Sequence, residues 1–187
     1  MPVDETTRTE HGDDPLVLDP EAISEERDAL GVGAGDAPPG TYVLIFGVDP
    51  AATIDVGALG TVEFPSGAYA YVGSAFGSNG LGRVDRHRRV AEGSHDVRHW
   101  HVDYLGGHAA ASLDSVVAAP HADVECRLAT ELRMRVKGQV SDGTAVPVPG
   151  FGASDCDCPA HLVGGANPDT LRTAAVDAIE AVTSPRS

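Results

Sequence analysis

Apolar and polar positions alternate along most of the chain after residue 38, in patterns that predict short strands and amphipathic helices. Residues 41–48 (TYVLIFGV) and 68–75 (AYAYVGSA) are rich in β-branched and aromatic residues and predict strands. Residues 53–64 (TIDVGALGTVEF) predict a hairpin with its turn at 57–60, and residues 112–119 (SLDSVVAA) predict a further strand.

Helical spacing of apolar positions marks the other elements. A glycine-containing loop leads into a helix over 81–92, residues 96–107 (DVRHWHVDYLGG) predict a short helix, and residues 122–137 predict a helix with its apolar positions on one face. Asn167 and Pro168 cap a last helix, while residues 146–162 hold too many prolines and glycines for a regular element and predict a structured loop. The fold class is therefore α+β, with a small, mainly antiparallel sheet flanked by helices.

The first 38 residues differ from the rest in composition. They carry eleven acids and two arginines, and a DAPPG break ends them. This predicts a disordered or loosely attached acidic tail, with a short helix inside 20–30 as the alternative. The length of 187 residues suits one domain over 39–165, with residues 166–187 as a C-terminal helix packed on it.

Charge is strongly unbalanced. There are 28 acidic against 13 basic residues, the net charge is −15, and Lys137 is the single lysine. This composition is typical of proteins from salt-loving microbes, because the Debye length falls to about 3 Å at molar salt and self-repulsion is screened. A mesophilic acidic protein is the alternative. The sequence shows no apolar stretch of membrane-spanning length, and three cysteines, an odd number, predict a reduced cytoplasmic protein without a disulfide framework.

Positive charge gathers in one segment. Residues 83–137 hold nine of the thirteen basic residues against eight acids, so the segment is net +1 and the rest of the chain is −16. A local relief of negative charge is what a polyanion-binding face requires. The predicted contacts to nucleic acid are Arg86, Arg88, Arg89 and Arg98. The alternative is that these arginines pair with acids along helix faces.

Five motifs in fixed order carry a resemblance to a known family. They read GTYVL (40–44), YAYVGSA (69–75), GLGRVDRH (80–87), HWHVDYL (99–105) and GFGASDCDCPAHL (150–162). Over about residues 40–163 the chain resembles the GIY-YIG nuclease family, and within it a compact archaeal and bacterial branch that is DUF123-like. The 28 residues between the two motif tyrosines exceed the usual short gap of that family, which suggests that the predicted hairpin is an insertion.

The resemblance implies a metal-dependent endonuclease that hydrolyses DNA phosphodiester bonds, with DNA repair as its setting. The implied catalytic residues are Tyr42, Tyr71, Arg83 and His87. Two tyrosine hydroxyls would converge, a nearby cation would lower the pKa of the phenols, an arginine would bind phosphate, and a histidine would relay a proton. Glu125 would hold Mg²⁺ or Mn²⁺, with Glu131 as the rival ligand. In isolation, the tyrosines also suit a packed core and the arginine a helix surface.

A second constellation follows in the last motif. Cys156, Cys158 and His161 lie within six residues and could supply three zinc ligands, with Cys126 or a histidine such as His99 as the fourth. The alternative is that they are small packed residues of a tight loop. Three functions remain open from sequence: the endonuclease, a non-catalytic nucleic-acid-binding module of the same fold, and a zinc-binding accessory protein.

Overall fold

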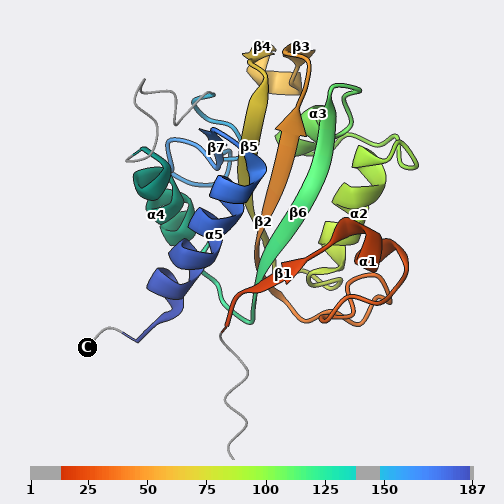
Figure 1. Ribbon diagram of the computed structural model, residues 1–187, viewed down its shortest axis with the longest axis vertical. Coiled ribbons are helices and arrows are strands. Elements are labelled where there is room, and N and C mark those ends of the chain that lie inside the picture. Colours follow the sequence, from red (N-terminus) through yellow and green to blue (C-terminus); the bar gives the residue numbers. More distant parts are fainter. Residues whose placement is uncertain (1–13, 138–147, 186–187) are drawn as a thin grey trace, which may run out of the picture.

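A computed structural model describes residues 14–137 and 148–185 of the chain, which fold around an antiparallel sheet (Figure 1). The strand order is β1-β6-β2-β5-β7, and a separate two-stranded hairpin joins β3 to β4. The strands are β1 (Leu16–Leu18), β2 (Gly40–Val48), β3 (Ala52–Asp55), β4 (Thr61–Phe64), β5 (Gly67–Ala75), β6 (Ala111–Pro120) and β7 (Leu162–Gly165). The predicted hairpin is confirmed, and its turn contains a single 3-10 turn over Gly57–Leu59.

Helices cover both faces of the sheet, which confirms the predicted α+β class. The helices are α1 (Pro20–Ser24), α2 (Gly82–Ala91), α3 (His101–Gly106), α4 (Glu125–Lys137) and α5 (Pro168–Thr183). Helices α1, α2 and α3 lie on one side of the sheet, and α4 and α5 lie on the other (Figure 1). A hydrophobic core lies on each face of the sheet, and strand β2 contributes to both. Tyr42 and Leu44 belong to one core, and Val43 and Ile45 belong to the other.

The two predicted amphipathic helices have the expected faces. In α4 the buried apolar positions include Leu128, Leu132 and Val136, so its stripe packs against the sheet and α5. In α5 the side chain of Asn167 accepts a hydrogen bond from the backbone N–H of Thr170, at 2.9 Å, which is the cap that the sequence predicts. Within the described parts of the chain, no helix has the length and apolar character needed to cross a bilayer.

The acidic segment differs from the loose tail that the sequence predicts. Strand β1 pairs with β6, and Leu18 and Ile23 lie in the core at 3% and 1% exposure. Asp19 caps α1 by accepting a hydrogen bond from the N–H of Glu21, in line with the alternative of a short helix in this region. The apolar residues here are too few for a periodic signal, yet they suffice to dock the segment. Residues 1–13 fall outside the described part.

The last motif forms a loop followed by an edge strand. Residues 148–161 contain the fully buried Phe151 and close on themselves through a hydrogen bond from the N–H of His161 to the Phe151 carbonyl, at 2.8 Å. Strand β7 then pairs with β5, although the sequence predicts only loop up to residue 162. Its glycines, Gly164 and Gly165, are poor strand formers and hide the signal. Residues 146–147 of the predicted loop lie outside the described residues.

Candidate functional site

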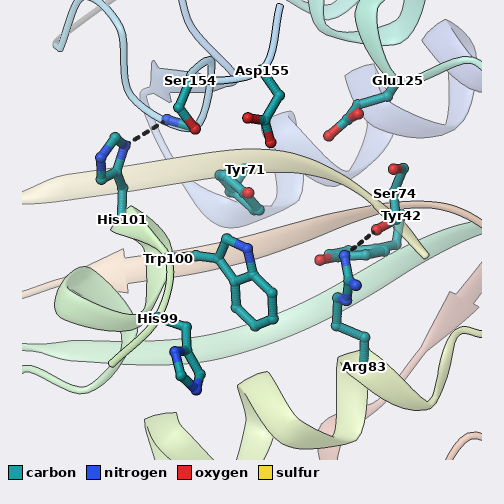
Figure 2. Close-up of a pocket in the computed structure, with 11 residues that line it drawn as sticks. Tyr42, Tyr71, Ser74, Arg83, His99, Trp100, His101, Glu125, Ser154 and Asp155 are labelled. Atoms are coloured by element: carbon teal, nitrogen blue, oxygen red, sulfur yellow. Dashed lines mark hydrogen bonds between the residues drawn. The ribbon is translucent and has the colours of Figure 1, made fainter. Parts of the chain in front are cut away.

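One pocket collects side chains that are far apart in the sequence (Figure 2). Its residues come from β2, β5, α2, α4, the start of α3 and the 148–161 loop: Tyr42, Tyr71, Ser74, Arg83, His99, Trp100, His101, Glu125, Gly152, Ser154 and Asp155. Four of the five residues that the resemblance implies as catalytic or as the Mg²⁺ or Mn²⁺ ligand therefore share this pocket. The fifth, His87, lies behind it, bonded to the hydroxyl of Tyr42.

Strand pairing brings the two tyrosines together. In the β2–β5 register Tyr42 lies opposite Gly73, and Leu44 lies opposite Tyr71. Alternate residues of a strand face the same side, so Tyr71 and Gly73 project to one face. The ring of Tyr42 crosses directly over Gly73, where an added Cβ would lie 2.5 Å from the phenol oxygen. Only glycine allows this close approach, which directs the Tyr42 hydroxyl toward α2.

A buried hydrogen-bonded chain runs from Tyr42 into the protein. The Tyr42 hydroxyl lies 2.9 Å from His87 Nε2, and His87 Nδ1 lies 3.2 Å from Asp103 Oδ1. Burial lowers the pKa of His87, although the Asp103 carboxylate opposes this, so the imidazole is neutral. The carboxylate can only accept, so Nδ1 carries the proton and Nε2 accepts from the tyrosine hydroxyl. Tyr42 and His87, both predicted as catalytic, are thus joined by a hydrogen bond.

Asp103 is the anchor of this chain, and the sequence predicts no role for it. Its side chain is 0% exposed. Arg86 donates to both oxygens, at 3.1 and 2.9 Å, and the backbone N–H groups of His99 and Trp100 donate at 2.8 and 3.1 Å. Burial would raise the pKa of this carboxyl, but the hydrogen bonds from His87, Arg86 and the backbone outweigh it and hold the pKa well below its usual range.

The phenols have raised pKa values, which differs from the prediction that a cation lowers them. Burial dominates at both sites, and the pKa of Tyr42 and that of Tyr71 lie well above 10. Arg83 acts in the lowering direction, but its effect is smaller. A free phenolate is therefore disfavoured at neutral pH, and any base function of Tyr42 has to pass through its bond to His87.

Arg83 enters the pocket from the first turn of α2. Its NH1 donates to the Ser74 carbonyl, at 2.7 Å, and its guanidinium carbon lies 4.8 Å from the ring centre of Trp100. The carbonyl and the aromatic ring fix the guanidinium plane, and within residues 14–137 and 148–185 its other nitrogens have no hydrogen-bond partner that would prevent contact with an anion. Trp100 also lies 4.6 Å from the Arg86 guanidinium, so one ring contacts both arginines.

Two of the predicted nucleic-acid contacts are committed to the protein itself. Arg86 is 15% exposed in its side chain and holds the Asp103 carboxylate. Arg88 is 9% exposed in its side chain and forms ion pairs with Asp85 and Glu92 on its own helix. The sequence predicts both on a DNA face. Arg88 instead pairs with acids of its own helix, which was the alternative, whereas Arg86 pairs with Asp103 on α3, which neither interpretation foresaw.

The other two predicted contacts are more open. The side chain of Arg89 is 46% exposed, and its Nε lies 3.2 Å from Asp85. Arg98 is half-buried and donates to the His95 carbonyl at 3.2 Å. A nucleic-acid face built from these arginines stays a prediction, carried by Arg89 more than by the others.

Oxygen donors face the pocket from two elements. Glu125, the first residue of α4, and Asp155, in the 148–161 loop, both direct carboxylates toward it, with the Ser154 hydroxyl nearby (Figure 2). Carboxylate and hydroxyl oxygens suit a hard cation such as Mg²⁺ or Mn²⁺, which keeps much of its water. The rival ligand Glu131 pairs with Arg135 at 2.8 Å and does not line the pocket.

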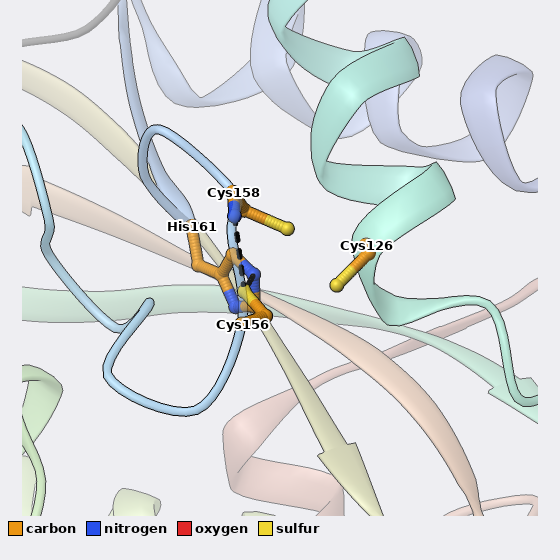
Figure 3. Close-up of side chains that lie close together, drawn as sticks. All are labelled: Cys126, Cys156, Cys158 and His161. Carbon is orange, nitrogen blue, oxygen red and sulfur yellow. Dashed lines mark hydrogen bonds between the residues drawn. The ribbon is translucent and has the colours of Figure 1, made fainter.

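The cysteines and a histidine form a second cluster (Figure 3). The ligand atoms of Cys126, Cys156, Cys158 and His161 all lie within 4.8 Å of one another, and the three cysteines are free. Thiolate and imidazole donors in this number could bind a metal ion. Cys126 therefore completes the set, whereas His99, the other predicted fourth ligand, lines the pocket instead.

His161 lies between the cluster and the pocket. Its side chain is 2% exposed, with Nε2 at 3.3 Å from Cys156 Sγ and Nδ1 at 3.3 Å from Glu125 Oε1. The Nδ1 contact lacks hydrogen-bond alignment, so among the described residues Nδ1 is a buried side-chain nitrogen without a hydrogen-bond partner. An imidazole nitrogen is costly to bury without such a partner.

The chain matches one known protein family. A family model described as "Domain of unknown function DUF123" matches residues 41–184. The chain belongs to this family. Searches of curated proteins and of solved structures found no match. The DUF123 match runs from β2 to the end of α5, so it includes every residue of the pocket and of the Cys/His cluster, whereas β1 and α1 precede it.

Sequence reasoning on this DUF123 chain missed several residues that complete the site. Trp100, His101 and Asp155 line the pocket, and Asp103 holds the histidine behind it. Trp100, His101 and Asp103 lie in the HWHVDYL motif, where the cluster of polar and aromatic residues on a short helix was a usable signal. Asp155 directly precedes Cys156, so its position follows from that of the Cys/His cluster.

Proposed function

We propose that this protein is a metal-dependent endonuclease that hydrolyses DNA phosphodiester bonds, as its resemblance to GIY-YIG nucleases implies. The observation that supports this most is the shared pocket: Tyr42, Tyr71, Arg83 and Glu125 come from four elements and face one space. Phosphodiester hydrolysis needs a base for water, positive charge for phosphoryl oxygens, and a site for a divalent ion. The pocket offers one group for each of these needs.

Proton removal is proposed to run through Tyr42. A water in the pocket donates to the phenol oxygen, and the Tyr42 proton moves to His87 Nε2 at 2.9 Å as the water oxygen attacks phosphorus. His87 then carries the charge beside the ionised Asp103. No free phenolate forms in this sequence, which suits the raised pKa of Tyr42. The phosphorus–oxygen bond to the leaving group breaks, and that oxygen takes a proton from solvent.

Arg83 and Glu125 are proposed to hold the phosphate and its ion. The guanidinium of Arg83 presents fixed donors to two phosphoryl oxygens, because Ser74 and Trp100 orient it. Glu125, together with Asp155 that lines the same pocket, would bind Mg²⁺ or Mn²⁺ mostly through water. The chemistry that such an ion supplies when bound is neutralisation of charge on the phosphoryl group.

Incubating the purified full chain with labelled DNA tests the proposal. The panel holds single-stranded, duplex, flapped and branched DNA, each with Mg²⁺, Mn²⁺ or EDTA, at molar KCl because the acidic composition predicts function in high salt. We expect cleavage of at least one form that depends on the divalent ion. Binding without cleavage of any form would favour the non-catalytic module, and neither binding nor cleavage would remove DNA as the substrate.

Replacement of Arg83 should separate turnover from folding. Arg83→Ala should lower the cleavage rate by about 100-fold, since a fixed charge on the transition state is lost. Arg83→Lys should recover only part of this, because an ammonium cannot form the two-pronged contact. The melting temperature should change little. The matched control is Arg172→Ala on α5, because its side chain pairs with Asp114 and Asp169 and does not line the pocket. Wild-type cleavage by Arg83→Ala would contradict the assigned role.

A second candidate function rests on the Cys/His cluster. Three thiols and an imidazole within 4.8 Å of one another suit Zn²⁺, which would make this a zinc-binding accessory protein. The non-catalytic DNA-binding module has less support, because Arg86 and Arg88 are taken up by internal ion pairs. A metal content of one zinc per chain with no cleavage activity would favour the accessory role.

A further inference from the structure

The 148–161 loop builds one wall of the pocket and also carries most of the Cys/His cluster. Gly152, Ser154 and Asp155 line the pocket, and Cys156 follows directly. On α4 the same adjacency recurs, because Glu125 faces the pocket and Cys126 belongs to the cluster. Two neighbouring pairs on separate elements thus join the pocket to the cluster.

The tip of this loop, residues 152–159, has few contacts with the rest of the protein. Its side chains at 154, 155, 157 and 159 are exposed, and the tip contributes no residue to either hydrophobic core. Its contacts include a hydrogen bond from the Gly152 N–H to His101 Nδ1, at 3.0 Å, and close packing of Gly152 on the Tyr71 ring. A short exposed segment with few apolar contacts opens at low cost. A metal ion bound both by the cysteines of the loop and by Cys126 would hold the tip in place.

The two ring nitrogens of His161 face different groups. Nε2 faces Cys156, so it is the nitrogen placed to join the thiols at a metal, and Nδ1 faces Glu125 at 3.3 Å without hydrogen-bond alignment. A histidine that binds metal through one nitrogen usually donates its other N–H to a carboxylate, which fixes the ring and the carboxylate together. The buried Nδ1, at 3.3 Å from Glu125, is the nitrogen placed to make this second contact.

We propose that a thiolate-preferring ion of the Zn²⁺ class, bound by Cys126, Cys156, Cys158 and His161, clamps the 148–161 loop to α4 and orients Glu125 through the His161 Nδ1–H. The role of Glu125 as the ligand of a second, catalytic ion rests on the proposed function. The clamp itself does not, because it concerns the assembly of the pocket wall and not the reaction.

Metal removal and return on the wild-type chain test the clamp without any activity assay. Trp100 is the single tryptophan and lines the pocket, so its fluorescence reports the state of the pocket. We expect one Zn²⁺ or Co²⁺ per chain, thiolate-to-cobalt absorption bands with Co²⁺, and a reversible change in Trp100 emission. Amide exchange over 150–161 should slow by about 100-fold when free Zn²⁺ exceeds its Kd by 100-fold.

Two matched pairs of variants locate the effect. Cys156→Ser should weaken Co²⁺ binding and change its spectrum, whereas Asp157→Asn, exposed between the two cysteines, should do neither. Glu125→Ala should lower metal affinity by about 10- to 100-fold through the loss of the His161 contact. Glu131→Ala, on the same helix and paired with Arg135, should leave the affinity unchanged.

Each contrary result overturns a stated part. Absence of metal binding, or metal binding that leaves Trp100 emission and loop exchange unchanged, would refute the clamp. Equal metal affinity in Glu125→Ala and Glu131→Ala would refute the link to Glu125. Unfolding of the whole chain on metal removal, seen by far-UV circular dichroism, would replace a local clamp with a general folding role. A failure of DNA cleavage alone changes none of these readouts.

Discussion

Replacing Tyr42 with phenylalanine should lower the rate of DNA cleavage by about 100- to 1000-fold while the fold stays intact. The substitution removes one oxygen and keeps the ring that lies over Gly73. That oxygen lies 2.9 Å from His87 Nε2, so in the proposed proton relay its loss separates a pocket water from the imidazole. Single-turnover cleavage at saturating Mg²⁺ measures the chemical step, and thermal unfolding measures the fold.

Tyr69→Phe is the matched control for this substitution. Tyr69 lies on the same strand two residues before Tyr71, and its hydroxyl donates to the Pro65 carbonyl, outside the pocket. Its loss should cost stability of about 1 kcal/mol and leave cleavage at the wild-type rate. If Tyr42→Phe also cleaves at the wild-type rate, the proton relay is wrong and Tyr71 becomes the next candidate for the base.

The elements with strong periodic patterns could be predicted from sequence, and those stabilised mainly by long-range contacts could not. The stripes of α4 and α5 and the β-rich segments of β2 and β5 carry their own signal. Strand β1 has three residues and exists through its pairing with β6, about a hundred positions later. Strand β7 likewise depends on β5, because two of its four residues are glycines.

At the site, sequence motifs supplied residue types and tertiary structure supplied their surroundings. Tyr42, Tyr71, Arg83 and Glu125 could be singled out from motif order, and they do share a pocket. The raised pKa of the phenols could not be foreseen, since it follows from burial against the sheet and helices. The pairing of Arg88 with acids on its own helix was visible as an i,i+3 and i,i+4 pattern, but the sequence does not show which alternative applies.

The Cys/His cluster is a second case in which sequence supplied the residues but not their arrangement. Cys156, Cys158 and His161 are close in sequence and could be grouped at once. The choice between Cys126 and His99 as the fourth ligand depends on how α4 meets the 148–161 loop, which local spacing does not encode. The structure selects Cys126 and, through the neighbouring Glu125, connects the cluster to the pocket.

Asp103→Ala is expected to have the largest effect on stability, about 3–5 kcal/mol in the free energy of unfolding at pH 7. The carboxylate is 0% exposed and accepts from both nitrogens of the Arg86 fork. Its removal leaves that guanidinium, at 15% side-chain exposure, and the N–H groups of His99 and Trp100 without their acceptor. Asp114→Ala is the control, because its exposed pair with Arg172 should contribute only about 0–1 kcal/mol.

The stability difference between wild type and Asp103→Ala should depend on pH in a way that shows whether the ionised carboxylate causes it. Hydrogen bonds depress the folded-state pKa of Asp103 below the unfolded value of about 3.9. Its contribution to stability is therefore complete above the unfolded pKa and is lost as pH falls through the folded pKa. The gap between wild type and Asp103→Ala should be constant from about pH 5 to 7 and should narrow below about pH 4. Denaturant unfolding at pH 7, 5 and 3 measures it. A gap of equal size at pH 3 and pH 7 would mean that side-chain packing, and not the ionised carboxylate, holds His87 and α3 in place.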